Sequence, residues 1–548
     1  MAEAISIRTL LQRWREVAAG TELLKPPNYG GPDLSLTHLV EHTDHVEPGA
    51  CFVARVRATS DGHGYIPLAA EKGASLIVGQ RPPGDLDFDL PPGVPYLQVQ
   101  DTALTMAWLA AAWERFPAQH LVTIGITGTD GKTTTANILY DLLRAGGLRT
   151  GLLSTLRAVV DKREEPLGLH VTTPEAPVVQ RYLRRMVDAG LTHCILEATS
   201  HGLAQQRVGA IDFDVAVVTN ITHEHLDYHG SYEAYFAAKA TLFEKVARDA
   251  WPVETDNGFK QKATKTIILN RDDASYWRLA AIPAPRRLTY GLQETADVMA
   301  RNVRFDASAT HFRLRLPEAE MPIAAHLAGN FNVYNMLAAA AAAHSLGVAP
   351  AATRQGLESV RALSGRMERV DEGQPFLTIV DFAHTPNALE QSIVATRRMI
   401  PSGGRIITVF GSAGRRDVEK RRLMAEISAR KADLTVLTAE DPRTESLEEI
   451  LEMMAAGCRR QGGVVGKSFW QVPDRGQAIY HALTLARPDD AVLICGKGHE
   501  QSMCFGTTEY PWDDVEATRT ALQAMRAGRP MPDLGLPTYD AAAPADAE

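Results

Sequence analysis

Short apolar runs alternate with helical patterns along most of the chain. The runs are rich in β-branched residues and are continuous, which is typical of parallel strands that are buried on both faces of a sheet. Examples are Leu121–Gly125, Cys194–Glu197, Val215–Asn220, Thr266–Asn270, Ile406–Phe410, Leu434–Thr438 and Ala491–Cys495. The pattern predicts an α/β fold class, with largely parallel sheets and flanking helices.

The chain is too long for one hydrophobic core, because its 548 residues exceed the roughly 250–300 at which cores stop growing. We expect an N-terminal domain over residues 1–117, a central domain over 118–362 and a C-terminal domain over 363–525. Residues 526–548 are rich in Pro, Ala and Asp, which predicts a flexible, solvated tail.

The composition is that of a folded, water-soluble protein, with 45% hydrophobic and 22% charged residues. The net charge of −9 argues against a nucleic-acid partner, which normally requires a basic surface. We find neither a signal-peptide pattern at the start nor an apolar stretch long enough to span a bilayer, so we expect a cytoplasmic protein with no membrane partner. The five cysteines show no metal-site spacing and are expected to be reduced and buried.

A glycine-rich segment, G-I-T-G-T-D-G-K-T-T-T at residues 125–135, follows an apolar run and precedes a helical pattern. In such a loop the backbone N–H groups bind phosphates, the lysine reaches the β- and γ-phosphates, and the next hydroxyl ligates Mg²⁺. The common form of the loop has glycine where this chain has Ile126. The predicted ATP-binding residues here are Gly128, Thr129, Asp130, Gly131, Lys132, Thr133 and Thr134.

Polar residues follow two further predicted strands. Glu197 ends one strand, and Val215–Asn220 leads into I-T-H-E-H-L-D-Y-H-G. Ligands of open α/β sheets bind beyond the carboxyl ends of the strands, so both clusters are expected near the nucleotide. Oxygen ligands suit Mg²⁺, which makes Glu197 a candidate ligand beside Thr133. His225 is a less usual candidate, and a solvated histidine at a helix start is the alternative.

Eight segments, in order along the chain, together resemble the Mur ligase family. They are T-G-T-D-G-K-T-T, H-V-T-T-P-E-A, E-A-T-S-H-G-L-A-Q-Q-R, T-N-I-T-H-E-H-L-D-Y-H-G, Y-F-A-A-K, L-A-G-N-F-N-V-Y-N, V-D-F-A-H-T-P-N-A-L and G-K-G-H-E. The resemblance is strongest to the MurE type, which adds the third residue of the peptidoglycan stem. It implies a first domain for the UDP end of the substrate, a central ATP-binding ATPase domain, and a Rossmann-like C-terminal domain that brings the incoming amino acid.

The resemblance implies a set of contacts to UDP-MurNAc-dipeptide. By similarity, these contacts would come from Thr43, Thr172, Thr173, Thr199, Gln205 and Arg207. Thr199 stands where the family more often has serine, which preserves the hydroxyl. The N-terminal domain departs most from the family, because Asp-Ser-Arg is replaced by His-Thr-Asp at residues 42–44 and Thr43 is the only hydroxyl in register.

The resemblance also implies a two-ion Mg²⁺ site. Lys239, in Y-F-A-A-K, matches a lysine that is carbamylated in the family. The carbamate would hold metal together with Thr133, Glu197 and His225. Taken by its residue type alone, Lys239 would be a surface lysine on a helix.

Further nucleotide contacts are implied in the second half of the chain. Asn332 and Asn335 match the motif on the adenine side, although helix capping is the ordinary explanation for such asparagines. Arg366 and Asp381 match residues of the C-terminal domain that reach the ribose and the phosphates. A surface arginine is the ordinary alternative for Arg366.

A basic loop, G-S-A-G-R-R-D-V-E-K-R-R-L-M, follows the run Ile406–Phe410 and is suited to charge that develops on a transferred phosphoryl group. The alternative is that these are only solvent-exposed charged residues with no part in the reaction. The family usually has Asp-Arg-Asp in this loop; here Arg415 replaces the first aspartate, while Lys420 and Arg421 remain. Lys420 is expected to be catalytic, and Arg421 to bind the amino acid.

The incoming amino acid is expected to bind near Asp441 and Arg443. The family members that use meso-diaminopimelate have Asp-Asn-Pro-Arg, and this chain has Glu-Asp-Pro-Arg at residues 440–443. Arg443 would hold a distal carboxylate, whereas the extra charge of Asp441 would favour a cation. Gly496 and Glu500 match residues that take the distal ammonium. Meso-diaminopimelate is favoured, and L-ornithine and L-lysine stay open.

The implied activity is that of a monomeric, ATP-dependent and ADP-forming ligase of cell-wall precursor synthesis. It would proceed through an acyl phosphate, with Lys132, Lys239, His225 and Lys420 as catalytic residues. A cyanophycin- or folylpolyglutamate-type ligase is one alternative, and the strings E-A-T-S-H-G and H-V-T-T-P weigh against it. A non-catalytic, nucleotide-dependent scaffold is another, and it predicts a lost lysine or metal ligand; none is lost.

Overall fold

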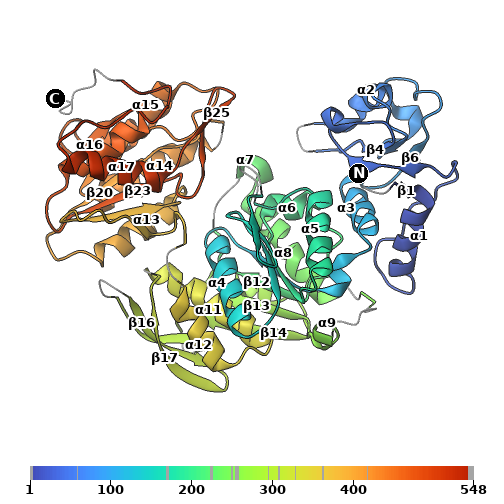
Figure 1. The fold of residues 1–548 in the computed structure, drawn as a ribbon, viewed down its shortest axis with the longest axis horizontal. Helices are drawn as coiled ribbons and strands as arrows, with labels where there is room; N and C mark the ends of the chain where they lie inside the picture. Colours follow the sequence, from blue (N-terminus) through green and yellow to red (C-terminus); the bar gives the residue numbers. More distant parts are fainter. Residues whose placement is uncertain are drawn as a thin grey trace.

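The computed structural model describes residues 4–57, 60–167, 172–222, 226–248, 251–252, 258–293, 295–305, 309–327, 329–360, 363–415 and 417–540. These residues form three α/β bodies that follow one another along the chain (Figure 1). The central body, coloured from cyan to yellow, lies between the N-terminal body in blue and the C-terminal body in orange and red. The predicted fold class, sheets with flanking helices, is confirmed.

A four-stranded parallel sheet forms the centre of the N-terminal domain, in the order β3 (His38–Val40), β4 (Ala50–Val53), β5 (Leu76–Gly79), β6 (Tyr96–Gln98). A separate antiparallel pair and three helices complete it: β1 (Ile5–Ser6), β2 (Ser35–Leu36), α1 (Ile7–Ala18), α2 (Ile66–Glu71) and α3 (Thr102–Trp113). Trp108 of α3 stacks on Trp14 of α1 and on Trp251, with ring centroids 5.3 and 5.1 Å away. Because Trp251 follows α8 of the central domain, this stack joins the two domains.

An eleven-stranded sheet, counted over the described residues, spans the central domain in the order β10-β9-β8-β11-β7-β12-β13-β14-β15-β16-β17. The neighbours from β8 to β15 pair in parallel, and the strands at both edges pair antiparallel. The strands are β7 (Val122–Thr127), β8 (Thr150–Leu153), β9 (Ala158–Val160), β10 (Arg163–Glu165), β11 (His193–Glu197), β12 (Val215–Val218), β13 (Thr266–Asn270), β14 (Arg286–Gly291), β15 (Val298–Phe305), β16 (Thr310–Leu316) and β17 (Ala319–Ala325).

Helices cover both faces of this sheet, which explains why its central strands are continuously apolar. One core packs α4, α11 and α12 against the sheet, and a second core packs α5, α6 and α8 against the other face. The helices are α4 (Lys132–Ala145), α5 (Ala176–Asp188), α6 (Ser200–Ala204), α7 (Leu226–His229), α8 (Tyr232–Arg248), α9 (Gly258–Lys262), α10 (Tyr276–Ala280), α11 (Asn330–Ser345) and α12 (Pro350–Ser359). Among the described helices, none combines the length and the apolar character needed to cross a membrane.

The C-terminal domain contains a six-stranded sheet in the order β18-β19-β23-β20-β21-β22, parallel except for the edge strand β18. A hairpin of β24 and β25 lies beyond it in the chain. The strands are β18 (Glu368–Arg369), β19 (Leu377–Asp381), β20 (Ile406–Phe410), β21 (Leu434–Leu437), β22 (Phe469–Gln471), β23 (Ala491–Cys495), β24 (Ser502–Phe505) and β25 (Thr508–Pro511). The helices are α13 (Pro386–Arg397), α14 (Val418–Lys431), α15 (Leu447–Arg460), α16 (Arg475–Leu485) and α17 (Asp514–Arg526).

The prediction of a flexible tail is wrong for residues 527–540. Met531 and Leu536 are buried in the core of the C-terminal domain. The Thr538 hydroxyl donates to Asp474 at 3.0 Å, and the Gln477 amide donates to the Asp540 carbonyl at 2.6 Å. The prediction rested on the average composition of the segment, which gives no weight to a few separate apolar side chains. Burial of these side chains is enough to hold an irregular segment on a core. Residues 541–548 lie outside the described part of the chain.

Candidate functional site

A cavity of about 580 Å³ is lined by both the central and the C-terminal domain. Its lining includes the phosphate-loop residues Thr129–Thr134 on one side and Arg366, Lys420 and Arg443 on the other. The Asn387 amide of the C-terminal domain donates to the Asp130 carboxylate at 3.1 Å, across the two domains. The volume is typical of a ligand site, and loops at the carboxyl ends of parallel strands surround it.

The phosphate-loop glycines explain the irregular spacing of this motif. Gly128 and Gly131 have φ of +151° and +82°, a conformation that side chains rarely allow. A Cβ atom on Gly128 would lie 1.8 Å from the Thr219 hydroxyl, and one on Gly131 would lie 2.3 Å from the Asn335 side chain. Ile126, by contrast, lies inside strand β7 and is fully buried. Glycine is therefore needed at 128 and 131, and not at 126.

Lys132 begins helix α4, and its side chain lies over the loop. Its ammonium donates to the carbonyls of Gly128 and Thr129 at 3.0 and 2.8 Å. The backbone N–H groups of the first turn of α4 point toward the same region, where a helix N-terminus favours anions. This arrangement fits the phosphates of a nucleotide.

Thr133 and Glu197 come together beside the loop. The Thr133 hydroxyl donates to Glu197 at 2.9 Å, and the Thr155 backbone N–H donates to the same carboxylate at 2.9 Å. Burial raises the pKa of Glu197, and the hydrogen bond from Thr155 and the charge of Lys132 oppose this shift. The pair fits Mg²⁺, which is commonly held by one or two carboxylates together with phosphate oxygens and water. Among the described residues, no cluster of three or more acidic, histidine or cysteine side chains could hold a metal without such added ligands.

Lys239 is buried, in contrast to the surface lysine that its residue type alone suggests. It is 1% exposed, its ammonium donates to the Gly128 carbonyl at 2.6 Å, and it lies 4.5 Å from the Tyr235 ring centre. The sequence did contain a sign that Lys239 is buried: Tyr235 and Phe243 lie four residues before and after it, on the same face of the helix. The other expected metal ligand from this region, His225, lies outside the described residues.

The adenine-side asparagines have different positions. Asn335 lines the cavity and accepts from the Thr135 hydroxyl at 3.3 Å. Asn332 is buried behind it and accepts from the Asn335 amide at 3.1 Å. Asn220 also lines the cavity and was not among the predicted site residues, although it lies only two residues after strand β12. Its side-chain oxygen Oδ1 accepts from the Asp130 backbone N–H at 3.1 Å, and its backbone carbonyl accepts from the Thr129 N–H at 2.7 Å, which fixes the phosphate loop.

The expected contacts to UDP-MurNAc-dipeptide divide into two groups. Thr172 and Thr199 line the main cavity, and Thr173 is buried with its hydroxyl on the Glu197 carbonyl at 2.8 Å. Arg207 and Gln205 form a second cluster, in which the Arg207 guanidinium donates to Gln205 at 2.8 Å. This cluster contacts the N-terminal domain through Gln205.

Arg55 of the N-terminal domain connects that domain to the second cluster. Its guanidinium donates to the Gln205 carbonyl at 3.1 Å, and it pairs with Glu41 at 2.8 Å. Glu175 pairs with Arg207 at 2.8 Å from the central domain. Thr43, in a short 3₁₀ helix (Thr43–His45), is not among the residues that line the main cavity.

Arg366 and Asp381, which were predicted to contact the nucleotide, both line the main cavity. The Asp381 carboxylate accepts from the Met367 backbone N–H and the Ser392 hydroxyl at 2.8 Å each. The Arg366 guanidinium lies 4.5 Å from the Phe382 ring centre. Burial lowers the pKa of Arg366, and the charges of Asp381 and Glu197 oppose this shift. The site thus brings a cation of the C-terminal domain toward the central domain.

The basic loop presents Lys420 to the cavity but not Arg421. Arg421 is 1% exposed, pairs with Glu445 at 2.7 Å and donates to the Ala413 carbonyl at 3.3 Å. The expectation that Arg421 binds the amino acid therefore has no support in its position. Consecutive residues of a helix point in different directions, so Lys420 and Arg421 of α14 cannot both face the same cavity.

Five residues form what we call the amino-acid corner of the cavity. They are Glu440, Asp441, Arg443, Gly496 and Glu500. Asp441 and Arg443 have φ of +42° and +54°, so this turn after β21 is strained. A Cβ on Gly496 would lie 2.2 Å from the Glu440 carboxylate, which explains the glycine. Burial raises the pKa of Glu440, and one of its oxygens has no hydrogen-bond partner within the described residues.

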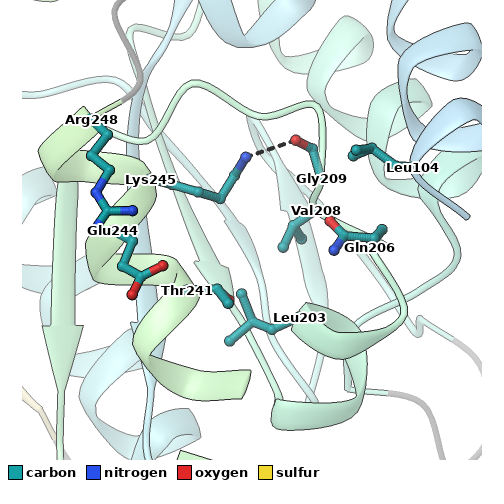
Figure 2. A pocket seen from close by; sticks show the side chains of 9 residues that line it. All are labelled: Leu104, Leu203, Gln206, Val208, Gly209, Thr241, Glu244, Lys245 and Arg248. Atoms are coloured by element: carbon teal, nitrogen blue, oxygen red, sulfur yellow. Dashed lines mark hydrogen bonds between the residues drawn. The ribbon is translucent and has the colours of Figure 1, made fainter. Parts of the chain in front are cut away.

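A second, smaller cavity of about 260 Å³ lies apart from these residues (Figure 2). Leu104 of α3, Leu203 of α6 and Thr241 of α8 contribute to its wall. The Lys245 ammonium donates to the Gly209 carbonyl at 2.8 Å across it. None of the predicted site residues lines this cavity.

Comparisons with known proteins support one family. Residues 126–343 match the Mur ligase middle domain, and residues 365–498 match the Mur ligase, glutamate ligase domain. A UDP-N-acetylmuramyl-tripeptide synthetase of Roseiflexus sp. is 40% identical over 92% of this chain and 98% of that protein. A UDP-N-acetylmuramoyl-L-alanyl-D-glutamate--2,6-diaminopimelate ligase of Geobacillus kaustophilus is 38% identical over 90% of this chain and 96% of that protein.

A solved structure supports the same assignment over all three domains. It is that of a UDP-N-acetylmuramoyl-L-alanyl-D-glutamate--2,6-diaminopimelate ligase, which superposes with a TM-score of 0.61 at 28% identity. The superposition covers 91% of this chain and 98% of that chain. The two family models meet at the cavity, because one contains the phosphate loop and the other contains Lys420 and the turn at residues 440–443. The chain belongs to the Mur ligase family.

Proposed function

We propose that this protein is an ATP-dependent ligase that joins a diamino acid to UDP-MurNAc-L-Ala-D-Glu, with release of ADP and phosphate. The observation that carries the proposal is the single cavity in which the phosphate loop faces the amino-acid corner. A ligase that activates a carboxylate with ATP and then joins an amine needs these two regions to meet. The relatives named as tripeptide synthetase and diaminopimelate ligase support this choice of substrates.

The proposed reaction has two steps. The γ-phosphate of ATP moves to the side-chain carboxylate of D-glutamate, which gives an acyl phosphate and ADP. The amine of the incoming amino acid then attacks the acyl carbon, an amide bond forms, and phosphate leaves. Lys132 on one wall and Lys420 on the other lie where they can neutralise charge on the transferred phosphoryl group.

Two Mg²⁺ ions are part of the proposal, and bound Mg²⁺ would lower the charge of the phosphate oxygens. Thr133 and Glu197 would hold one ion. A carbamate on Lys239, together with His225, would serve the other. The burial of Lys239 against Gly128, at the phosphate loop, supports a role near the phosphates.

The UDP-MurNAc-dipeptide is proposed to run from the N-terminal domain to the main cavity. Thr172 and Thr199 line the cavity and would bind its peptide end. Gln205 and Arg207, which contact Arg55 and Glu175, lie at the junction of the two domains and would bind the part before it. Thr43 remains a proposed contact for the uridine end.

We further propose meso-diaminopimelate as the incoming amino acid, with Arg443 binding its distal carboxylate and Glu500 its distal ammonium. Asn335, Arg366 and Asp381 would contact the nucleotide. The protein is proposed to act as a cytoplasmic monomer without nucleic acid, in keeping with its net charge of −9.

The test is a ligation assay with purified protein, ATP, Mg²⁺, UDP-MurNAc-L-Ala-D-Glu and meso-diaminopimelate, L-lysine or L-ornithine in turn. We expect phosphate release that requires both the nucleotide-linked dipeptide and the amino acid, and a product with the mass of the tripeptide. Lys132→Ala should abolish both signals, and Lys162→Ala, at an exposed lysine outside the cavity, should not. Phosphate release without a joined product from any of the three amino acids would refute the proposal.

A further inference from the structure

Lys497 lies behind the wall of the amino-acid corner and is fully buried. Its ammonium lies 2.9 Å from an Asp441 carboxylate oxygen and 2.7 Å from a Glu500 carboxylate oxygen. The same Asp441 oxygen accepts from the Cys504 backbone N–H at 3.0 Å. Both carboxylates line the cavity, and Lys497 itself is not among the lining residues. One buried cation therefore holds two carboxylates of the corner from behind.

The position of Lys497 favours its charged form. Burial alone would favour the neutral amine, but the charges of Glu500 and Asp441 outweigh burial, so the pKa of Lys497 is raised. A buried ion pair of this kind is stable only when both partners are present, because a lone buried charge is costly. Asp441 and Lys497 are thus energetically dependent on each other.

This pair changes the charge of the corner. Three carboxyl groups line it, at Glu440, Asp441 and Glu500, and Arg443 is the one cation among its five residues. Lys497 supplies a second cation from behind, and Lys420, on the neighbouring wall, is the largest opposing charge at Glu440. The carboxyl groups and the cations then balance in number. Without Lys497, the corner would carry an excess of negative charge and would favour a cation.

This charge balance affects the guanidinium of Arg443. Arg443 lines the cavity and is half-buried, and within the described part of the chain its side chain makes no ion pair. The two acidic residues nearest to it in the sequence have other partners: Asp441, two residues before it, is bound to Lys497, and Glu445, two residues after it, pairs with Arg421. Arg443 therefore remains available for a carboxylate of a ligand.

We propose that Lys497 sets the amino-acid preference of this site by neutralising Asp441 from behind the cavity wall. The corner then accepts a distal group that carries both an ammonium and a carboxylate, and it disfavours a distal ammonium alone. Lys497 is a positioning residue, because it acts through Asp441 and Glu500 and does not line the cavity. This inference rests on the proposed ligase function and gives its Asp441 a specific role.

The test compares wild type, Lys497→Met and the double variant Lys497→Met with Asp441→Asn, using meso-diaminopimelate and L-lysine. KM and kcat are measured separately for each amino acid. We expect wild type to prefer meso-diaminopimelate. Lys497→Met should shift the ratio of the two KM values at least about tenfold toward L-lysine, which corresponds to about 1.4 kcal/mol. The double variant should regain the wild-type preference, because the neutral amide needs no counter-ion.

Controls separate this effect from loss of folding. Lys467→Met, at an exposed lysine outside the cavity, should leave both KM values unchanged. If Lys497→Met does not fold, the double variant carries the test, since it has no unpaired charge at 441 and must show the wild-type preference. An equal KM change for both amino acids in Lys497→Met, or a folded double variant without the wild-type preference, would overturn the inference.

The wild-type measurement distinguishes this inference from the function on which it rests. Wild type that joins L-lysine in preference to meso-diaminopimelate overturns the role of Lys497 and leaves the ligase proposal standing. Wild type that joins neither amino acid, nor L-ornithine, refutes the ligase proposal itself.

Discussion

The Thr133 hydroxyl donates a 2.9 Å hydrogen bond to Glu197, across 64 residues of sequence. Thr133 lies in the first turn of α4, which follows β7, and Glu197 is the last residue of β11. Strands β7 and β11 are parallel neighbours, so their carboxyl ends meet at the same edge of the sheet. The two expected magnesium ligands are therefore adjacent because of the strand order.

Replacing Glu197 with glutamine tests this pair. The change keeps the size of the side chain and removes the charge that would hold Mg²⁺. We expect kcat to fall by about 100-fold or more, and the Mg²⁺ concentration for half-maximal rate to rise. A Mg²⁺ titration of phosphate release measures both quantities, and Glu164→Gln, an exposed glutamate of β10, is the control. Normal turnover of Glu197→Gln at limiting Mg²⁺ would contradict the assignment.

Gly131→Ala should weaken ATP binding by more than its backbone strain explains. Gly131 has φ of +82°, and an added Cβ would lie 2.3 Å from Asn335, which lines the cavity. Gly147→Ala is a matched control, because Gly147 has φ of +78° and nothing lies within 4 Å of its added Cβ. The positive φ should make Gly147→Ala cost about 1 kcal/mol of stability, and Gly131→Ala should cost more because of the close approach to Asn335. Only Gly131→Ala should raise the Kd of a non-hydrolysable ATP analogue, by about tenfold or more. Equal Kd values in the two variants would argue against the steric explanation.

Lys239→Ala should abolish ligation if a carbamate on this lysine is required. Short carboxylic acids should then partly restore turnover, because they return a carboxylate to the emptied space near Gly128. Mass spectrometry of the intact protein under carbon dioxide can detect the modification independently. Lys245→Ala, on the same helix but not among the residues that line the main cavity, serves as a control for helix α8. Undiminished turnover of Lys239→Ala would end the carbamate hypothesis.

The stability of the protein should fall between about pH 6.5 and pH 4, in part because of His193. Burial lowers the pKa of His193 to about 4, and its pKa in the unfolded chain is about 6.5. Between these values the unfolded state binds more protons, so the free energy of unfolding rises with pH and is lost as the pH falls. The full contribution of this side chain is about 3 kcal/mol.

His193→Gln should therefore show a smaller loss of thermal midpoint between pH 7 and pH 4.5 than wild type. His42→Gln, at an exposed histidine, should follow the wild-type curve. Differential scanning calorimetry across this pH range measures the midpoints. Parallel curves for wild type and His193→Gln would show that another group, such as His499, controls the acid sensitivity; burial lowers the pKa of His499 to about 3.

Local pattern was sufficient for the phosphate loop and for Glu197. Gly131 and Thr133 come after the buried parallel strand β7, and Glu197 is the last residue of its neighbour β11; ligand sites of open sheets lie at that edge. The same rule applied to every strand end would also have found Asn220, two residues after the end of β12. The fold class could be predicted for a related reason, since continuously apolar strands require helices on both faces.

Other positions could not be read from local pattern alone. The ion pair that neutralises Asp441 is one example. Its partner Lys497 lies in a loop after β23, whereas Asp441 lies in the turn after β21. Arg421 was expected to bind the amino acid from its match to a family loop, and the match alone does not show that its side chain is buried and pairs with Glu445. Met531 and Leu536 are buried although their segment has the composition of a tail, because a few contacts with an existing core outweigh average composition.

The stack of Trp14, Trp108 and Trp251 allows the contact between the N-terminal and central domains to be followed by spectroscopy. The rings of Trp108 and Trp251 are stacked and nearly parallel, with 4° between their planes, and the Trp14 ring is stacked on Trp108 with 16° between the planes. Indoles this close couple their electronic transitions, so the near-ultraviolet circular dichroism and the fluorescence of the protein report on their arrangement. A change in the position of the N-terminal domain relative to the central domain should therefore change these spectra without any added label.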